Sequence, residues 1–82
     1  MIHVVFLAQL REQLGISALD VPHTEAKTIN ELKEYLMEKN PFWQTALSNM
    51  KLLVAVNHAY AKNNASLVDG DEVAFFPPVT GG

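Results

Sequence analysis

Short segments of alternating apolar residues at both ends of the chain predict β-strands. The first covers residues 2–8, with Ile2, Val4 and Phe6 on one side, and the last covers residues 72–76, Glu-Val-Ala-Phe-Phe. Successive side chains of a strand point to opposite faces, so both segments present apolar residues on both faces. Residues 16–21, 52–56 and 59–61 predict three further strands, the last two joined by a tight turn at residues 57–58.

The strongest helix signal lies in the middle of the chain. Thr28 and Glu31 form a capping box, in which the Thr side chain accepts from first-turn amides and the Glu side chain reaches back. The helix should end at residues 40–41, Asn-Pro, and should bury a stripe made of Ile29, Leu32 and Leu36. A shorter helix is expected over residues 9–14, stopped by Gly15. Three apolar residues, Phe42, Trp43 and Leu47, should form a turn that covers the rim of the core.

The element order ββαββ indicates an α+β fold, with a mixed sheet wrapped over one main helix. The first and last strands should lie side by side and parallel at the centre of this sheet. If Val4 and Phe6 face the helix, their neighbours Val73 and Phe75 should face it too. Leu7 and Phe76 then belong to the opposite, open face, and Tyr60 can join them.

The end of the chain has an unusual composition. Residues 69–71, Asp-Gly-Asp, signal a turn before the last strand, and Pro77 and Pro78 should stop that strand and keep the chain extended. We expect a domain over residues 1–76 and a tail over residues 77–82, which spans roughly 20 Å when fully extended. The tail continues through Val79 and Thr80 to Gly81 and Gly82 and should end in a free carboxylate without a nearby Cβ. It could be a frayed terminus, or it could enter a partner's active site.

Composition narrows the classes of function. The chain has 82 residues, 49% hydrophobic and 18% charged, with a net charge of −3, which argues against nucleic-acid binding. No apolar run reaches the roughly 18 residues of a membrane span, and Met1 leads directly into a strand, so a cytoplasmic protein is expected. The absence of cysteine excludes disulfides and thiol nucleophiles. The three histidines have no metal-ligand spacing, and no metal site is expected.

At this point the chain shows a resemblance. Its ending, Phe-Phe-Pro-Pro-Val-Thr-Gly-Gly, together with residues 4–15, Val-Val-Phe-Leu-Ala-Gln-Leu-Arg-Glu-Gln-Leu-Gly, resembles the small subunits of molybdopterin synthase. The resemblance covers essentially the whole chain in length and element order. It implies a ubiquitin-like β-grasp fold and a non-catalytic sulfur carrier for molybdenum cofactor biosynthesis.

The resemblance also implies partners and site residues. An ATP-dependent activating enzyme would adenylate Gly82, a sulfur donor protein would supply the sulfur of a thiocarboxylate, and the large synthase subunit would receive it in a heterotetramer. The carrier itself would bind no cofactor, because ATP belongs to the activating enzyme. Gly82 and Gly81 are the reactive end. Arg11 is either a solvated surface charge or a partner contact, and the candidate partner-binding residues are Leu7, Arg11, Tyr60, Phe76, Pro77, Pro78, Val79 and Thr80.

Three alternatives stay open on the sequence alone. A sulfur carrier of thiamine synthesis would share the fold, the Gly-Gly end and the activation chemistry. A ubiquitin-like modifier would be joined to lysines through an isopeptide bond. A plain interaction domain would carry an inert tail, and its function would survive the deletion of Gly81 and Gly82.

Overall fold

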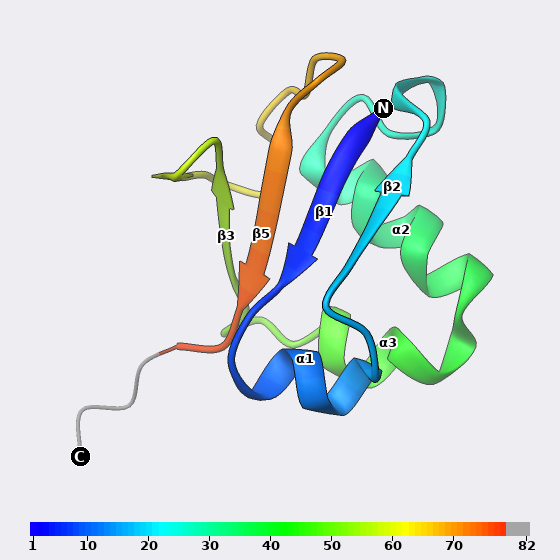
Figure 1. Cartoon of the computed structure of the whole chain (residues 1–82), viewed down its shortest axis with the longest axis vertical. Helices are drawn as coiled ribbons and strands as arrows, with labels where there is room; N and C mark the ends of the chain where they lie inside the picture. The colour runs from blue at the N-terminus through cyan, green and yellow to red at the C-terminus, as the bar shows by residue number, and fades with distance from the viewer. Residues whose placement is uncertain (79–82) are drawn as a thin grey trace.

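A five-stranded mixed sheet forms the frame of the protein, which we describe from a computed structural model for residues 1–78 (Figure 1). The strands are β1 (Ile2–Phe6), β2 (Ala18–Val21), β3 (Leu53–Val56), β4 (Ala59–Tyr60) and β5 (Glu72–Phe76). Their order in the sheet is β2-β1-β5-β3-β4. β1 and β5 are parallel neighbours at the centre, and the other pairs are antiparallel. The predicted mixed sheet with parallel first and last strands is confirmed.

Helical segments cover one face and one end of this sheet. They are α1 (Gln9–Leu14), the 3-10 turn η1 (His23–Glu25), α2 (Ile29–Lys39), the 3-10 turn η2 (Pro41–Trp43) and α3 (Gln44–Leu47). Figure 1 shows α2 across one face of the sheet, with α1 and α3 at the end where β5 finishes. α1 ends as predicted at Gly15, whose φ of 82° is left-handed and whose N–H donates to the Arg11 carbonyl at 2.9 Å.

The start of α2 confirms the predicted N-cap and corrects one contact. The Thr28 hydroxyl accepts from the Glu31 N–H at 3.1 Å, as the capping box requires. The Glu31 carboxylate accepts from the Lys27 N–H at 2.9 Å, one residue earlier than a capping box predicts. Thr28 thus satisfies a first-turn donor that the helix would otherwise leave unpaired, and Glu31 satisfies the backbone donor just before the cap.

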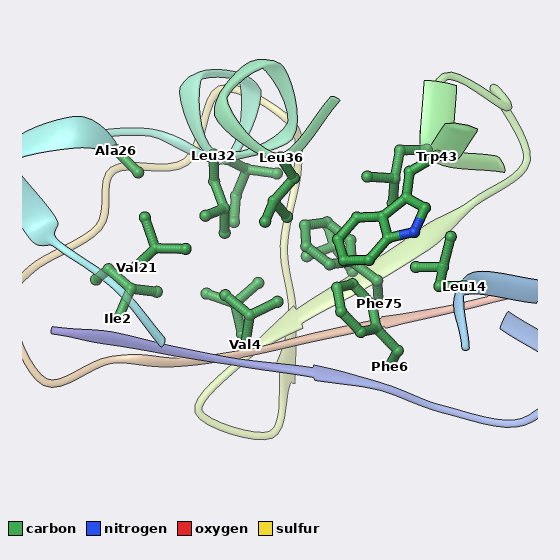
Figure 2. Packing of buried hydrophobic residues seen from close by; sticks show 14 of the residues in the cluster. Ile2, Val4, Phe6, Leu14, Val21, Ala26, Leu32, Leu36, Trp43 and Phe75 are labelled. Atoms are coloured by element: carbon green, nitrogen blue, oxygen red, sulfur yellow. The ribbon is translucent and has the colours of Figure 1, made fainter. Parts of the chain in front are cut away.

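The core lies between the sheet and α2 (Figure 2). Ile2, Val4, Val21, Leu32 and Leu36 converge there from β1, β2 and α2. At the other end of the core the Phe6 ring contacts Trp43 edge-on, with centroids 5.5 Å apart, and stacks on Phe75 at 6.2 Å. Edge-on and offset stacked pairs are the favoured geometries of aromatic rings, so this end of the core is both large and well ordered.

The segment after α2 corrects another prediction. Trp43 and Leu47 do enter the core, whereas the Phe42 side chain is 98% exposed. Residues 41–43 form a 3-10 turn, in which neighbouring side chains point about 120° apart. When Trp43 turns inward, Phe42 must therefore turn out.

Several strands are shorter than the apolar runs that predicted them. β1 stops at Phe6 instead of residue 8, because Ala8 takes a positive φ of 55° that no strand allows. β2 begins at Ala18 instead of residue 16, although the Phe6 N–H still donates to the Ser17 carbonyl at 2.9 Å. β3 starts at Leu53 instead of residue 52, and β4 ends at Tyr60 instead of residue 61. The turn between them is confirmed, with positive φ at Asn57 and His58.

Candidate functional site

The two central strands divide their side chains between the core and the opposite, outer face of the sheet. In the parallel register Val4 pairs with Val73 and Phe6 with Phe75. All four side chains are fully buried. The predicted assignment of these four residues to the helix side is therefore confirmed, and the alternate residues face outward.

Large apolar side chains gather on the outer face near the end of β5. Tyr60 is 78% exposed and Leu7 is 38% exposed, while Phe76 is half-buried. The Tyr60 and Phe76 rings lie 5.9 Å apart between centroids, so the structure brings these two predicted residues together. Leu7 follows Phe6, the partner of Phe75, and thus lies on the same face as Phe76.

Leu53 joins this surface, although sequence reasoning did not select it. It pairs with Phe76 across β3 and β5, so both side chains share the outer face. The sequence shows that Leu53 and Ala55 point to one face of the strand and Val54 and Val56 to the other. Only the antiparallel register with β5 shows that the face of Leu53 is the outer one. We call Leu7, Leu53, Tyr60 and Phe76 the outer-face patch.

A hydrogen-bonded clamp fixes the hairpin that carries Tyr60. The Asn57 side chain donates to the buried Asp71 carboxylate at 2.9 Å and accepts from the Glu72 N–H at 3.0 Å. The other Asp71 oxygen accepts from the Val68 N–H at 2.9 Å. These bonds tie the β3–β4 turn to the start of β5, and they set the position of Tyr60 over Phe76.

Arg11 is tied to the backbone at the end of β1. Its Nε donates to the Phe6 carbonyl at 3.3 Å, while the residue stays exposed. The guanidinium is thus held beside Leu7 instead of projecting freely into solvent. A guanidinium has further N–H donors on its other two nitrogens, so this bond is compatible with a partner contact.

The chain leaves the sheet through Pro77 and Pro78, both half-buried, which we call the tail root. The predicted residues Val79, Thr80, Gly81 and Gly82 lie outside the described residues. On the helix side, the tail root borders a groove of about 440 Å³ between α1 and α3. The tail root therefore lies between two surfaces, the outer-face patch and this groove.

The far end of the outer face is polar. His3 Nδ1 lies 2.8 Å from Asp20 Oδ1, and His58 Nε2 lies 3.6 Å from Glu72 Oε1. These pairs mark the limit of the outer-face patch. Within residues 1–78, no group of three His, Asp or Glu side chains has the arrangement of a metal site.

Shifted pKa values occur away from the outer-face patch and the tail root. A hydrogen bond from the Met1 amino group to Asp69 lowers the pKa of that exposed carboxyl. Partial burial lowers the pKa of Lys33, whose Nζ donates to Asn63 at 2.8 Å.

Comparison with known proteins decides the family. The ThiS family model matches residues 4–82. The chain belongs to the ThiS family. A relative from Escherichia coli (strain K12), named molybdopterin synthase sulfur carrier subunit, is 45% identical over 82 residues and covers all of both chains. The resemblance to small subunits of molybdopterin synthase is thereby confirmed.

Solved structures show the fold of this ThiS-family chain. SAMP1 from Haloferax volcanii superimposes with a TM-score of 0.83 at 24% identity, over 99% of this chain and 98% of that one. A complex of subunits 1 and 2 of molybdopterin-converting factor from Helicobacter pylori matches with a TM-score of 0.69 at 23% identity, over 99% and 97%. The predicted α+β, ubiquitin-like β-grasp fold is confirmed. Among the described residues, no helix is long and apolar enough to span a membrane.

Proposed function

We propose that this ThiS-family chain is the sulfur carrier subunit of molybdopterin synthase. The observation that carries the proposal is the 45% identity, over the full length of both chains, to a relative with that name. The ending Phe-Phe-Pro-Pro-Val-Thr-Gly-Gly and the outer-face patch beside the tail root support it, because a carrier needs a reactive end and a docking surface next to it.

The proposed chemistry takes place at Gly82. Its carboxylate attacks the α-phosphate of ATP on an activating enzyme, which forms an acyl adenylate and releases pyrophosphate. A persulfide on a donor protein then attacks the acyl carbon and displaces AMP. A thiol cleaves the S–S bond of the resulting acyl disulfide, which leaves a disulfide and the thiocarboxylate. That sulfur is donated in the large subunit to build the dithiolene of molybdopterin. Attack at the acyl carbon requires close approach, and Gly81 and Gly82 offer no side chain to obstruct it.

The outer-face patch is the proposed docking surface for the large subunit. Tyr60 and Phe76 form a paired aromatic surface in the free protein, with Tyr60 78% exposed. Aromatic residues at the centre of an interface supply much of its binding energy. The Helicobacter pylori structure contains a complex of subunits 1 and 2, which supports a two-subunit assembly, and we extend the proposal to a heterotetramer. Arg11, held at the edge of the patch, is proposed to contact the same partner.

The remaining parts of the proposal concern cofactors and location. ATP is bound by the activating enzyme, and this chain contributes only the carboxylate that is activated. The cytoplasmic location expected from the sequence stays a prediction, which cell fractionation checks.

Mass spectrometry tests the carrier function. The protein is incubated with the activating enzyme, ATP and a sulfur donor, and the intact mass should rise by the difference between sulfur and oxygen. A variant that lacks Gly82 should show no such gain, while it still binds the large subunit in calorimetric titration. The matched control is Met50→Ala, which changes a side chain that is 99% exposed and should gain sulfur like the wild type. Sulfur transfer by the variant without Gly82 would refute the carrier mechanism.

The same experiment separates the alternatives. A thiamine-pathway carrier would gain sulfur but would not bind the large synthase subunit. A protein modifier would be found joined to lysines of other proteins. The name of the 45% identical relative favours the molybdopterin synthase assignment over both.

A further inference from the structure

The groove beside the tail root has no role in the carrier chemistry described above. Its floor is apolar and comes from α1, α3 and the residue that precedes β3, with Leu10, Leu14, Ala46 and Leu52. Figure 1 shows α1 and α3 together at the end of the sheet where β5 finishes. On the other side of the tail root lies the outer-face patch, so the two surfaces flank the same short segment.

The rim of the groove carries hydrogen-bonding groups and no charge. Gln9, Gln13, Asn49 and Thr45 line it, and among residues 1–78 no residue that lines the groove is ionisable. A primary amide both donates and accepts, and so does a hydroxyl. This chemistry suits an uncharged, extended segment, whose backbone N–H and C=O groups pair with the rim while an apolar side chain enters the floor.

Phe42 adds a large apolar side chain to the same rim. It is 98% exposed in the free protein, and it lines the groove together with the tail root residues Pro77 and Pro78. An aromatic ring left in water at the edge of a groove gains free energy when a partner covers it.

The separation between Pro78 and Gly82 restricts which partner can cover the groove. The two residues are four positions apart in the sequence, which corresponds to at most about 13 Å. Any active site that holds Gly82 therefore lies within that distance of Pro78, which is itself part of the groove wall. The entrance of that active site must therefore come close to one wall of the groove.

We propose that the groove is a second docking site for the large synthase subunit, which inserts an uncharged extended segment with an apolar side chain between α1 and α3. This inference rests on the function proposed above. The large subunit then covers the outer-face patch on one side of the tail root and the groove on the other. Contact on both sides fixes the direction in which the tail enters the active site.

Two fully exposed apolar residues provide the test. Phe42→Ala removes a side chain at the groove, and Met50→Ala removes one that is 99% exposed and does not line it. Calorimetric titration with the large subunit should show a Kd raised about tenfold or more for Phe42→Ala and changed less than about twofold for Met50→Ala. Ala46→Arg, which puts a long charged side chain into the groove floor, should weaken binding further, and circular dichroism checks that it folds.

The outcomes separate this inference from the proposed function. If the wild type binds the large subunit and Phe42→Ala binds equally well, the groove is not a docking site, while the carrier function stands. If Phe42→Ala and Ala46→Arg bind the large subunit normally but lose affinity for the activating enzyme, the groove binds that enzyme and the proposed partner is wrong. If the wild type does not bind the large subunit at all, both proposals fail. If Ala46→Arg does not fold, the comparison of the Kd of Phe42→Ala with that of Met50→Ala decides the result.

Discussion

Phe75 and Phe76 are the same residue type at adjacent positions, and the structure places them in opposite environments. Phe75 is fully buried and stacks on Phe6, with ring centroids 6.2 Å apart. Phe76 is half-buried on the outer face, where its ring lies 5.9 Å from that of Tyr60. Figure 2 shows Phe75 pointing into the core together with Phe6 and Trp43.

The difference shows how one strand can serve two purposes. β5 is hydrogen-bonded to β1 on one side and to β3 on the other, so it is held at the centre of the sheet. Its inward residues stabilise the fold, and its outward residues are free to form a docking surface. Because the tail root continues from this strand, the proposed docking surface is directly continuous with the tail root.

The largest expected effect is on stability, from Phe75→Ala. Removing a buried phenylalanine from a core usually costs about 3–5 kcal/mol. A domain of 82 residues has a total unfolding free energy of only about 4–12 kcal/mol at typical stability per residue. The variant should therefore lose a large share of its unfolding free energy, which urea denaturation followed by circular dichroism measures as a much lower midpoint. Phe42→Ala is the control and should leave the midpoint unchanged, and a loss below about 1 kcal/mol at Phe75 would contradict the core assignment.

The second effect should appear in binding. Phe76→Ala is expected to weaken association with the large subunit by about 2–4 kcal/mol, the range for an aromatic anchor at an interface centre. Its stability should fall by less than that of Phe75→Ala, because Phe76 is only half-buried. Calorimetric titration and urea denaturation on the same samples measure both quantities. If the variant unfolds and has no specific binding defect, the two faces have been assigned the wrong way round.

The smallest effect, on the unfolding free energy, should come from two nearly isosteric substitutions in β1. Val4→Thr places a hydroxyl in the core without an assigned partner, which costs about 1–3 kcal/mol. Val5→Thr makes the same chemical change on the outer face, where water can reach the hydroxyl, and should cost less than half as much. Thermal unfolding of the two variants compares them, and equal losses would show that burial does not alternate along β1 as described.

Much of this arrangement could be predicted because its signals are local. β5 matches its predicted bounds, since a turn signal precedes it and Pro77 follows it. The ends of α1 and α2 were also predictable, from Gly15 and from the Thr28 cap. The burial of Val73 and Phe75 followed from the alternation of side chains once the parallel pairing with β1 was assumed.

The remaining features depend on contacts between distant residues. The pattern of residues 42–43 does not show which of two adjacent aromatic rings turns inward, because that choice depends on where Phe6 lies. The position of Leu53 on the outer face required the register between β3 and β5. The groove could not be foreseen, since α1, α3 and the tail root come from three separate parts of the chain.

The parallel pairing of β1 with β5 also has a consequence for biosynthesis. Val4 and Val73 are partners in the sheet, so its centre is closed by residues from nearly opposite ends of the sequence. Such non-local pairing slows folding, because the intervening chain must be ordered before the contacts form. The sheet cannot be completed until residues 72–76 have been translated, and a nascent chain that stops earlier lacks the strand that joins β1 to β3. A chain that stops before residue 76 therefore lacks both the completed sheet and the Phe76 side chain of the outer-face patch.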